Sequence, residues 1–408
     1  MVRTRRRIPA LVLLLSCAAW LPHCKPKATP NQGEKLRDLD DRLTISALRS
    51  YADIAFAAYD DSVRGVQALG VAIEALLAAP SPQTLARAQQ AWLAARIPYV
   101  QTEVFRFYDG PIDAVELQIN TWPIDESFVE AADGERQLGI VQDTERFPVL
   151  SAGLLAELNG KDGETSISTG YHVLEFLLWG RDTNEAGPGE RSYHDFVTQG
   201  KTRAAALAER RGSYLRIACQ LLEQHLVQVR EAWSAGEAPS YREHFLAPPP
   251  ERGLYLALRG MAKLSGPELA GERLTVPYET KSQENEHSCF SDNTHADVVG
   301  DALGVENVCL GRYTRTDGTR ISGPGICAAV AHALPLLGRA LTRQISDSVS
   351  AARSIPAPFD RAIVGDDKAA GRAAIKRTIV SLREQAVLTE RALNSLALEE
   401  PVRVSVAR

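Results

Sequence analysis

A long run of helical periodicity between residues 43 and 77 is the feature that most restricts the fold. Apolar side chains recur there close to every 3.6 residues, at Leu48, Ala52, Ala55, Tyr59, Val63, Val66, Ile73 and Leu77. Pro80 ends the run, and Ser81 followed by Pro82 is typical of an N-cap and the first position of a new helix. The folded part of the chain therefore begins with two consecutive amphipathic helices.

Helical patterns also fill most of the remaining chain, whereas the alternation typical of strands is nearly absent. They cover residues 147–158, 168–179, 193–233, 254–264, 267–280, 325–350 and 369–396. Long helices joined by loops with Gly and Pro, without a βαβ rhythm, predict an all-α fold of helix bundles. Because 408 residues ordinarily make two domains, we expect one bundle over residues 41–190 and a second over residues 191–400.

The first 17 residues have the form of an export signal. Four arginines precede an apolar run from Ile8 to Leu15 that is too short to span a bilayer. The run closes with Leu14-Leu15-Ser16-Cys17, which is similar to a bacterial lipoprotein box; acylation of Cys17 is expected, with cleavage without lipid as the alternative. Residues 18–40, which include a stretch rich in Pro and Lys, predict a flexible tether. We expect a lipoprotein of the periplasm or outer membrane that loses its signal peptide and contacts the membrane by its lipid anchor alone.

Charge and cysteine spacing argue against two classes of partner. The formal charge of −5 becomes −9 once the four signal arginines are removed, and no long basic stripe occurs, so nucleic acid is not expected as a partner. Cys219, Cys289, Cys309 and Cys327 have no spacing typical of a metal knuckle. A disulfide among the last three suits an exported protein, with free buried cysteines as the alternative.

His172 and Glu175 are the first candidate site residues. They lie three residues apart on the predicted helix 168–179, so they share a helix face, and the apolar residues around them would keep water from both. If Ser168 or Thr169 caps this helix, His172 lies in its first turn. One interpretation is a pair of metal ligands, and the other is a core histidine bonded to a nearby carboxylate.

Two further acids are candidate ligands. Glu103 continues the apolar stripe of the second helix at a position where a leucine would be expected, and Arg96 and Arg106 flank it. It is either an additional oxygen ligand or one partner of an internal ion pair that fixes helix packing. Asp125 follows Ile124 in a loop, where it presents a carboxylate to a cleft or caps a helix.

The second half of the chain contributes four interface candidates. Glu272 lies in one acidic segment, and Glu286, His287 and His295 lie together in another. These residues reach His172 only if the two halves of the chain pack face to face. A polar loop between domains, with Asp292 or Thr294 capping the next helix, is the alternative interpretation.

Several blocks of the sequence resemble the imelysin family, whose members are exported bacterial proteins linked to iron uptake and were once classed as metallopeptidases. The blocks are YVQTEVFRFYDGPID, INTWPIDE, GYHVLEFLLWGRD, ELAGERLTV, EHSCFSDNTH and PFD, in this order. The resemblance implies two related four-helix bundles packed face to face, with the site at their interface. It maps the family's Gly-x-His-x-x-Glu signature onto Gly170, His172 and Glu175, and related iron-uptake proteins imply acidic ligands at Glu103 and Asp125.

These observations favour a binding protein over an enzyme. One histidine with several carboxylates (His172, Glu175, Glu103 and Asp125) suits iron better than a soft thiolate metal. A zinc peptidase would need His-Glu-x-x-His or His-x-x-Glu-His, and Phe176 stands where the second motif requires histidine. We therefore predict a protein that binds iron, or a small iron-bearing ligand, in iron uptake, with an outer-membrane transporter as a candidate partner. A zinc-dependent metallopeptidase and a metal-free envelope interaction protein are the alternatives.

Overall fold

The amphipathic run near the start of the folded chain forms one helix, α1 (Asp41–Ala78), as predicted. The computed structural model describes residues 39–132, 134–135, 137–184, 187–236 and 240–399. The expected signal peptide, Cys17 and the tether up to residue 38 lie outside these ranges. Asp40 caps α1 by accepting hydrogen bonds from two backbone N–H groups of its first turn. Of the eight apolar positions in the pattern, all except Leu77 are buried.

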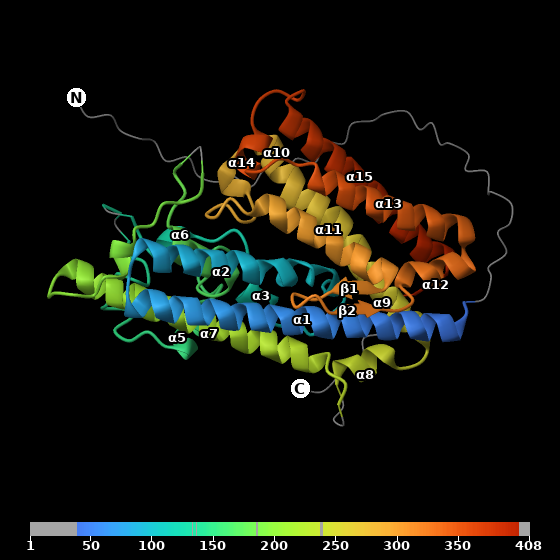
Figure 1. Ribbon diagram of the computed structural model, residues 1–408, viewed down its shortest axis with the longest axis horizontal. Helices are drawn as coiled ribbons and strands as arrows, with labels where there is room; N and C mark the ends of the chain where they lie inside the picture. The colour runs from blue at the N-terminus through green and yellow to red at the C-terminus, as the bar shows by residue number, and fades with distance from the viewer. Residues whose placement is uncertain (1–38, 133, 136, 185–186, 237–239, 400–408) are drawn as a thin grey trace. The chain divides into compact units, whose positions relative to one another are not determined.

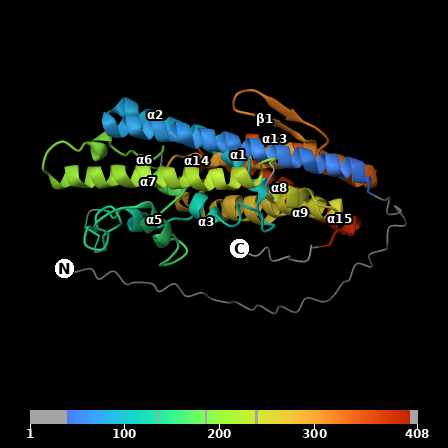
Figure 2. The ribbon, with the colours of Figure 1, turned by 90° about the horizontal axis from the view of Figure 1, so that it is seen from below.

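A first group of helices surrounds α1. Helix α2 (Pro82–Val100) begins with a capping box formed by Ser81 and Thr84 and runs beside α1. On another face α1 packs against α7 (Arg203–Ala232), and the short helix α6 (Tyr171–Trp179) contacts both α2 and α7. Figures 1 and 2 show α1, α2 and α7 running alongside one another.

A second group forms from the later part of the chain. It consists of α9 (Pro250–Lys263), the π-helix η3 (Leu264–Thr275), α11 (Thr294–Leu310), α13 (Pro335–Arg353) and α15 (Ala370–Ser395). Helix α15 packs against α13, η3 and α9, while α11 contacts α2 of the first group and α9 contacts α1. The described residues belong to one compact unit, and the division into two domains at residue 190 stays a prediction.

Short elements connect these long helices. In chain order they are η1 (Glu103–Phe105), α3 (Glu116–Ile119), α4 (Glu126–Val129), α5 (Ala152–Leu158), η2 (Tyr193–Phe196), α8 (Tyr241–Leu246), α10 (Val276–Thr280), η4 (Gln283–Asn285), α12 (Ile326–Ala333) and α14 (Phe359–Ile363). The fold is therefore mostly helical, as the sequence predicted. Buried apolar side chains of both groups form one continuous core. Within the described ranges, no helix combines the length and apolar character needed to cross a bilayer.

Two of the predicted helices are divided in the structure. The segment 193–233 forms η2 and then α7, which begins after Thr202 as its N-cap. The segment 325–350 forms α12 and α13, separated at Leu334, whose φ of −128° and ψ of 76° are not helical. Pro335 explains the second break, because a proline pushes the preceding residue out of the helical region.

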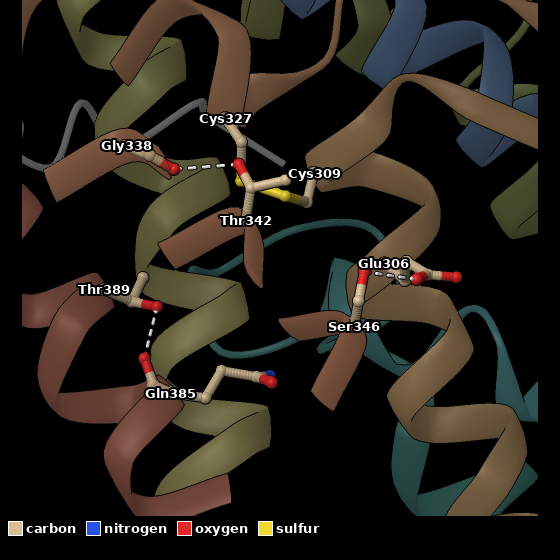
Figure 3. The surroundings of a disulfide bond; sticks show 8 residues. All are labelled: Glu306, Cys309, Cys327, Gly338, Thr342, Ser346, Gln385 and Thr389. Carbon is tan, nitrogen blue, oxygen red and sulfur yellow. Dashed lines mark hydrogen bonds between the residues drawn. A yellow bond between two sulfur atoms is a disulfide. The ribbon is translucent and has the colours of Figure 1, made fainter. Parts of the chain in front are cut away.

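A β-hairpin between α11 and α12 is a feature that the sequence patterns did not predict. Its strands β1 (Arg312–Thr314) and β2 (Arg320–Ser322) are antiparallel, with Tyr313 opposite Ile321. A disulfide between Cys309 and Cys327 closes the segment that contains the hairpin, as Figure 3 shows. The predicted bridge among the last three cysteines is thus present, and Cys289 and Cys219 are buried thiols.

Candidate functional site

Helix α6 begins directly after Gly170, a position that only glycine fits without strain. The φ angle of Gly170 is +96°, and a Cβ atom there would lie 2.6 Å from the backbone oxygen of Ile119. Neither Ser168 nor Thr169 caps the helix, because their hydroxyl groups donate to backbone carbonyls of other segments. The condition of a cap from Ser168 or Thr169 is therefore not met, but His172 does lie in the first turn of α6.

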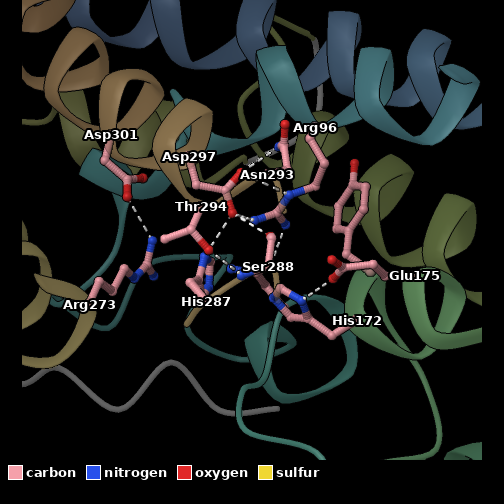
Figure 4. Close-up of polar contacts among 12 residues, drawn as sticks. Arg96, His172, Glu175, Arg273, His287, Ser288, Asn293, Thr294, Asp297 and Asp301 are labelled. Carbon is pink, nitrogen blue, oxygen red and sulfur yellow. Dashed lines mark hydrogen bonds and ion pairs between the residues drawn. The ribbon is translucent and has the colours of Figure 1, made fainter. Parts of the chain in front are cut away.

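His172 and Glu175 bind each other. Nδ1 of His172 lies 2.9 Å from Oε2 of Glu175, and both side chains are fully buried (Figure 4). The other carboxylate oxygen, Oε1, accepts hydrogen bonds from the backbone N–H and the hydroxyl of Ser291, at 2.9 and 2.6 Å. Burial raises the pKa of Glu175 to about 8, although the bonds from Ser291 favour its ionised form. Glu175 thus orients the imidazole, and the two groups do not aim at a separate common point.

The second nitrogen of His172, Nε2, is buried and has no hydrogen-bond partner in the part of the chain that the structure describes. The rings of His287 and Trp122 lie against the imidazole, with centroid distances of 4.7 and 5.1 Å. Burial, together with His287 and Arg96, lowers the pKa of His172 well below its usual value. The ring is therefore neutral, and when Nδ1 carries the proton, Nε2 offers a free lone pair.

Asp297 of α11 binds both the loop that carries His287 and Arg96 of α2. Its Oδ2 atom lies 2.9 Å from Nδ1 of His287 and accepts hydrogen bonds from the Ser288 hydroxyl at 2.6 Å and from Arg96 at 2.7 Å (Figure 4). Burial alone would raise the pKa of Asp297, but Arg96 and His287 outweigh it and hold that pKa well below its usual range. A buried ion pair between α2 and α11 therefore fixes the loop that carries His287.

Glu103 lies in an ion-pair network, as the second interpretation of the sequence expected. Arg106 and Arg273 each donate to its Oε2 atom at 2.6 Å. Burial would raise the pKa of Glu103, but the two guanidinium groups hold it well below the usual range. Arg273 also binds Glu268, five residues earlier, at 2.8 Å, a spacing that the wider turn of the π-helix brings onto one face. Arg273 further binds Asp301 at 2.8 Å.

Asp125 is not part of this network. It is exposed and caps α4 by accepting a hydrogen bond of 2.9 Å from the backbone N–H of Ser127. The capping interpretation therefore describes this residue. Its carboxylate is already used by the helix that follows it.

The four interface candidates of the second half separate into different surroundings. His287 contacts His172, whereas Glu272 is exposed and lines a nearby cavity. His295 lies further along, with its Nδ1 atom 3.2 Å from the backbone oxygen of Asp292. The start of α11 has no side-chain cap, so the cap by Asp292 or Thr294 in the alternative interpretation is absent.

Glu286 belongs to a separate group of four buried carboxylates, which we call the acid group: Asp182, Glu286, Asp292 and Asp360. Both oxygens of Glu286 and of Asp292 lack hydrogen-bond partners among the described residues. Burial, with the repulsion of the other acids, raises the pKa of Asp292 to about 7. Burial likewise raises the pKa of Asp182 to about 6 and that of Glu286 well above its usual value.

The four predicted metal ligands differ in whether their side chains are available to bind a metal. In the described ranges, no group of three or more His, Cys, Asp and Glu side chains is arranged to hold a metal ion. Glu103 is bound by arginines, Asp125 caps a helix, and Glu175 is bonded to His172. The structure thus brings His172 and Glu175 together but not the full set of four. The atom that fits a metal is Nε2 of His172, whose ring a carboxylate orients as in many metal-binding histidines.

A polar cavity of about 340 Å³ lies beside these residues. Its walls include three acids and two arginines, together with aromatic and amide groups: Glu116, Glu268, Glu272, Arg106, Arg273, Trp122, Asn120 and His287. Trp122 and His287 both line the cavity and contact the ring of His172. The imidazole is therefore one side chain away from an acid-rich space.

Sequence reasoning missed several residues of this network. The sequence patterns assigned no role to Asp297, Ser291 or Trp122. One signal was available: Asp297 and Asp301 lie four residues apart within a helix, so they share one face, and both are buried against arginines.

The fold and the site together define a class: a predominantly helical protein with a buried imidazole–carboxylate pair beside an acid-rich cavity. The chain belongs to the imelysin family, because the family model described as Imelysin matches residues 55–389, which is most of its length. The resemblance inferred from the sequence blocks is thereby confirmed.

Individual relatives are more distant. Iron-regulated protein A of Synechococcus elongatus is 22% identical over 326 residues, which cover 78% of each chain. A crystal structure from Parabacteroides distasonis, of a protein assigned as an iron-regulated protein A precursor, superposes with a TM-score of 0.65 at 18% identity, covering 87% of this chain and 96% of the other. An imelysin-like protein from Psychrobacter arcticum gives a TM-score of 0.58 at 14% identity, with 90% and 99% covered. The two structures establish the shared fold.

Proposed function

We propose that this protein binds a small iron-bearing ligand in the cavity beside His172 and acts in bacterial iron uptake. The observation that carries the proposal is the buried Nε2 atom of His172, which has no hydrogen-bond partner in the described chain, while Nδ1 is engaged by Glu175. A buried polar atom without a hydrogen bond costs free energy unless a ligand uses it, and Nε2 offers a lone pair when Glu175 is ionised and accepts the proton of Nδ1. An imidazole whose other nitrogen binds a carboxylate is a common ligand of borderline metals such as iron.

The donor set favours iron that arrives with ligands of its own. His172 supplies one nitrogen, and Glu103, which would have to supply an oxygen, is bound by Arg106 and Arg273. A bare ion would then lack most of its coordination shell, whereas a chelate or hydrated ion carries it. The bound iron supplies the Lewis-acid centre, and the chain's own residues orient the imidazole and enclose the ligand. Three acids and two arginines line the cavity, so their charges nearly balance and set no strong preference for the charge of the chelate.

The name of the relative from Synechococcus elongatus, an iron-regulated protein, supports the connection to iron. We further propose that the chain is exported, anchored by a lipid at Cys17, and that it hands its ligand to an outer-membrane transporter. The two groups of helices are proposed to correspond to the two related bundles of the family, with the site between them. The zinc-dependent peptidase stays an alternative prediction, for which the described side chains offer no three-ligand set.

The metal-free interaction protein is the second candidate, and one observation favours it. The charged residues of the site largely neutralise one another, with Arg96 on Asp297 and Arg273 on Glu103. A network of this kind needs no ligand, because its ion pairs hold the two groups of helices together on their own. It accounts for Arg96 and Glu103 but leaves Nε2 of His172 unexplained.

Titration with Fe²⁺ and, separately, with ferric maltolate, a neutral chelate without carboxylate groups, tests the proposal. We expect the wild type to bind one of these probes and His172→Ala to lose at least tenfold in affinity. His332→Ala, which removes an exposed histidine of α12, is the matched control and should bind as the wild type does. Wild-type affinity in a folded His172→Ala protein would overturn the proposal. The proposal is also overturned if the wild type binds neither probe.

A further inference from the structure

A second cavity, of about 600 Å³, is lined in part by α6 and shares no lining residue with the first. Phe176 and Trp179 form part of its wall, and three arginines reach it from different segments: Arg181, Arg191 and Arg211. Arg181 follows α6, Arg191 lies in the loop before η2, and Arg211 lies on α7. Three separate segments of the chain therefore place arginine side chains around one space.

Three arginines and three acids (Glu130, Glu190 and Asp195) line this cavity, so its charges balance overall, but the buried part, made of Arg191, Arg211 and Glu130, carries one net positive charge. The side chains of Arg191 and Arg211 are each 7% exposed, and they share one carboxylate, that of Glu130, which is 12% exposed. Arg211 donates from Nε to both oxygens of Glu130, at 3.0 and 3.1 Å, and Arg191 lies 3.1 Å from Oε2. Asp195, the other acid beside Arg191, is 42% exposed and 3.2 Å away, so water screens its charge.

Arg191 is incompletely paired. Its Nε atom is buried and has no hydrogen-bond partner among the described residues. Burial lowers the pKa of Arg191 below its usual value, because Glu130 and Asp195 do not offset the desolvation and the nearby charge of Arg211 adds to it. Nε itself is covered, so an anion in the cavity meets the other atoms of Arg191, and the unused Nε–H marks this guanidinium as incompletely satisfied by the protein.

We propose that this cavity binds the carboxylate group of a small organic acid. A guanidinium group presents its N–H donors in a plane that matches a carboxylate, so paired hydrogen bonds can form. Arg191 provides the buried contact, and Arg181, which is 31% exposed and also pairs with Glu126 and Glu135, is a further cation in the cavity wall. Phe176 and the almost buried Trp179 provide an apolar wall for the carbon atoms of the ligand. The proposal does not depend on iron binding at His172.

Calorimetric titration of metal-free protein with succinate tests this assignment, with succinamide as the uncharged analogue and phosphate as a tetrahedral anion. We expect succinate to bind, succinamide not to bind, and phosphate to bind more weakly than succinate. Arg191→Gln should weaken succinate binding at least tenfold. Arg216→Gln, which removes a partly exposed arginine that pairs with Glu74 on the same helix as Arg211, should leave it unchanged.

A second variant protects the test against a folding defect. If Arg191→Gln does not fold, Arg181→Gln removes the more exposed cation and should still weaken succinate binding severalfold. His172→Ala should bind succinate normally, which separates this site from the proposed iron site. The proposal is overturned if succinate does not bind, if succinamide or phosphate binds as well as succinate does, or if the folded arginine variants keep wild-type affinity.

Discussion

Nδ1 of His172 lies 2.9 Å from Oε2 of Glu175, so the two functional groups of the Gly-x-His-x-x-Glu signature bind each other. This geometry assigns them different tasks. The histidine keeps one nitrogen for a ligand, and the glutamate sets the orientation and the tautomer of the ring. Because Ser291 donates two hydrogen bonds to the same glutamate, a residue of the later part of the chain fixes the orientation of the pair.

Glu175→Gln tests this division of tasks. The amide places an NH₂ group against either His172 or the two donors of Ser291, so the ring is held less well. We expect affinity for the iron probe to fall by about 10–100-fold, the usual effect of losing such an orienting group, while His172→Ala falls further. Competition with a chelator of known affinity measures both. Equal losses in the two variants would identify Glu175 as a direct ligand instead.

Asp297→Ala is expected to lower the free energy of unfolding by about 3–5 kcal/mol, because it leaves the buried charge of Arg96 without its partner. Urea denaturation measures the loss. Asp347→Ala, at an exposed position of α13, should change stability little. The double variant Arg96→Met/Asp297→Leu removes both charges and should be more stable than Asp297→Ala. A double variant as unstable as the single one would show that the unpaired charge is not the cause.

The acid group predicts how stability depends on pH. Carboxyl groups of an unfolded chain titrate near pH 4, whereas burial raises the pKa of Asp292 to about 7 and that of Asp182 to about 6 in the folded protein. Between about pH 4 and pH 7 the folded protein therefore binds more protons than the unfolded chain does. The contribution of these groups to the free energy of unfolding is fully present below that window and falls as pH rises through it.

Asp292→Asn should remove part of this dependence. Asparagine tolerates the left-handed backbone of this position, where φ is +55°, and it carries no charge at any pH. We expect the variant to gain on the order of 1 kcal/mol over the wild type at pH 8 and almost nothing at pH 4. Thermal unfolding at both pH values measures the difference. An equal effect at pH 4 and pH 8 would contradict the assignment.

Gly170→Ala should destabilise the protein through two separate effects. The φ of +96° disfavours alanine, and the new Cβ would lie 2.6 Å from the backbone oxygen of Ile119. Gly200→Ala separates the effects, because Gly200 has a φ of +101° with no heavy atom within 4 Å of the added Cβ. We expect about 1 kcal/mol of destabilisation at residue 200 and about 3 kcal/mol or more at residue 170. Similar losses at both positions would show that the clash is relieved cheaply.

Long periodic segments made most of the helices predictable. Residues 43–77 and 369–396 coincide closely with α1 and α15, because an apolar stripe over many turns admits one helical register. Local signals failed where tertiary contacts decide. Ser168 and Thr169 have the chemistry of caps, yet their hydroxyl groups bond to distant carbonyls. The π-helix η3 could not be distinguished from an α-helix, because a pattern of 3.6-residue spacing does not describe its wider turns.

The candidate site was predictable in its parts but not in its connections. The place of Glu103 on an apolar stripe correctly indicated a buried acid, although the second helix ends at Val100 and Glu103 lies in η1. A stripe cannot tell a metal ligand from an ion pair, because the deciding partner, Arg273, lies 170 residues away in sequence. Asp125 is the opposite case, because its role as a helix cap depends only on the backbone N–H of Ser127, two residues away.

The disulfide and the hairpin together determine which parts of the site can move. Cys309 attaches the last turn of α11 to Cys327 of α12, and Arg315, in the hairpin between them, forms ion pairs with Asp60 and Asp61 of α1. The C-terminal end of α11 is thereby tied to two other helices, so a sliding motion of the whole helix would break several strong contacts at once. Ligand entry should accordingly involve movement of the loop around His287 or rotation of the Trp122 side chain, while α11 keeps its position.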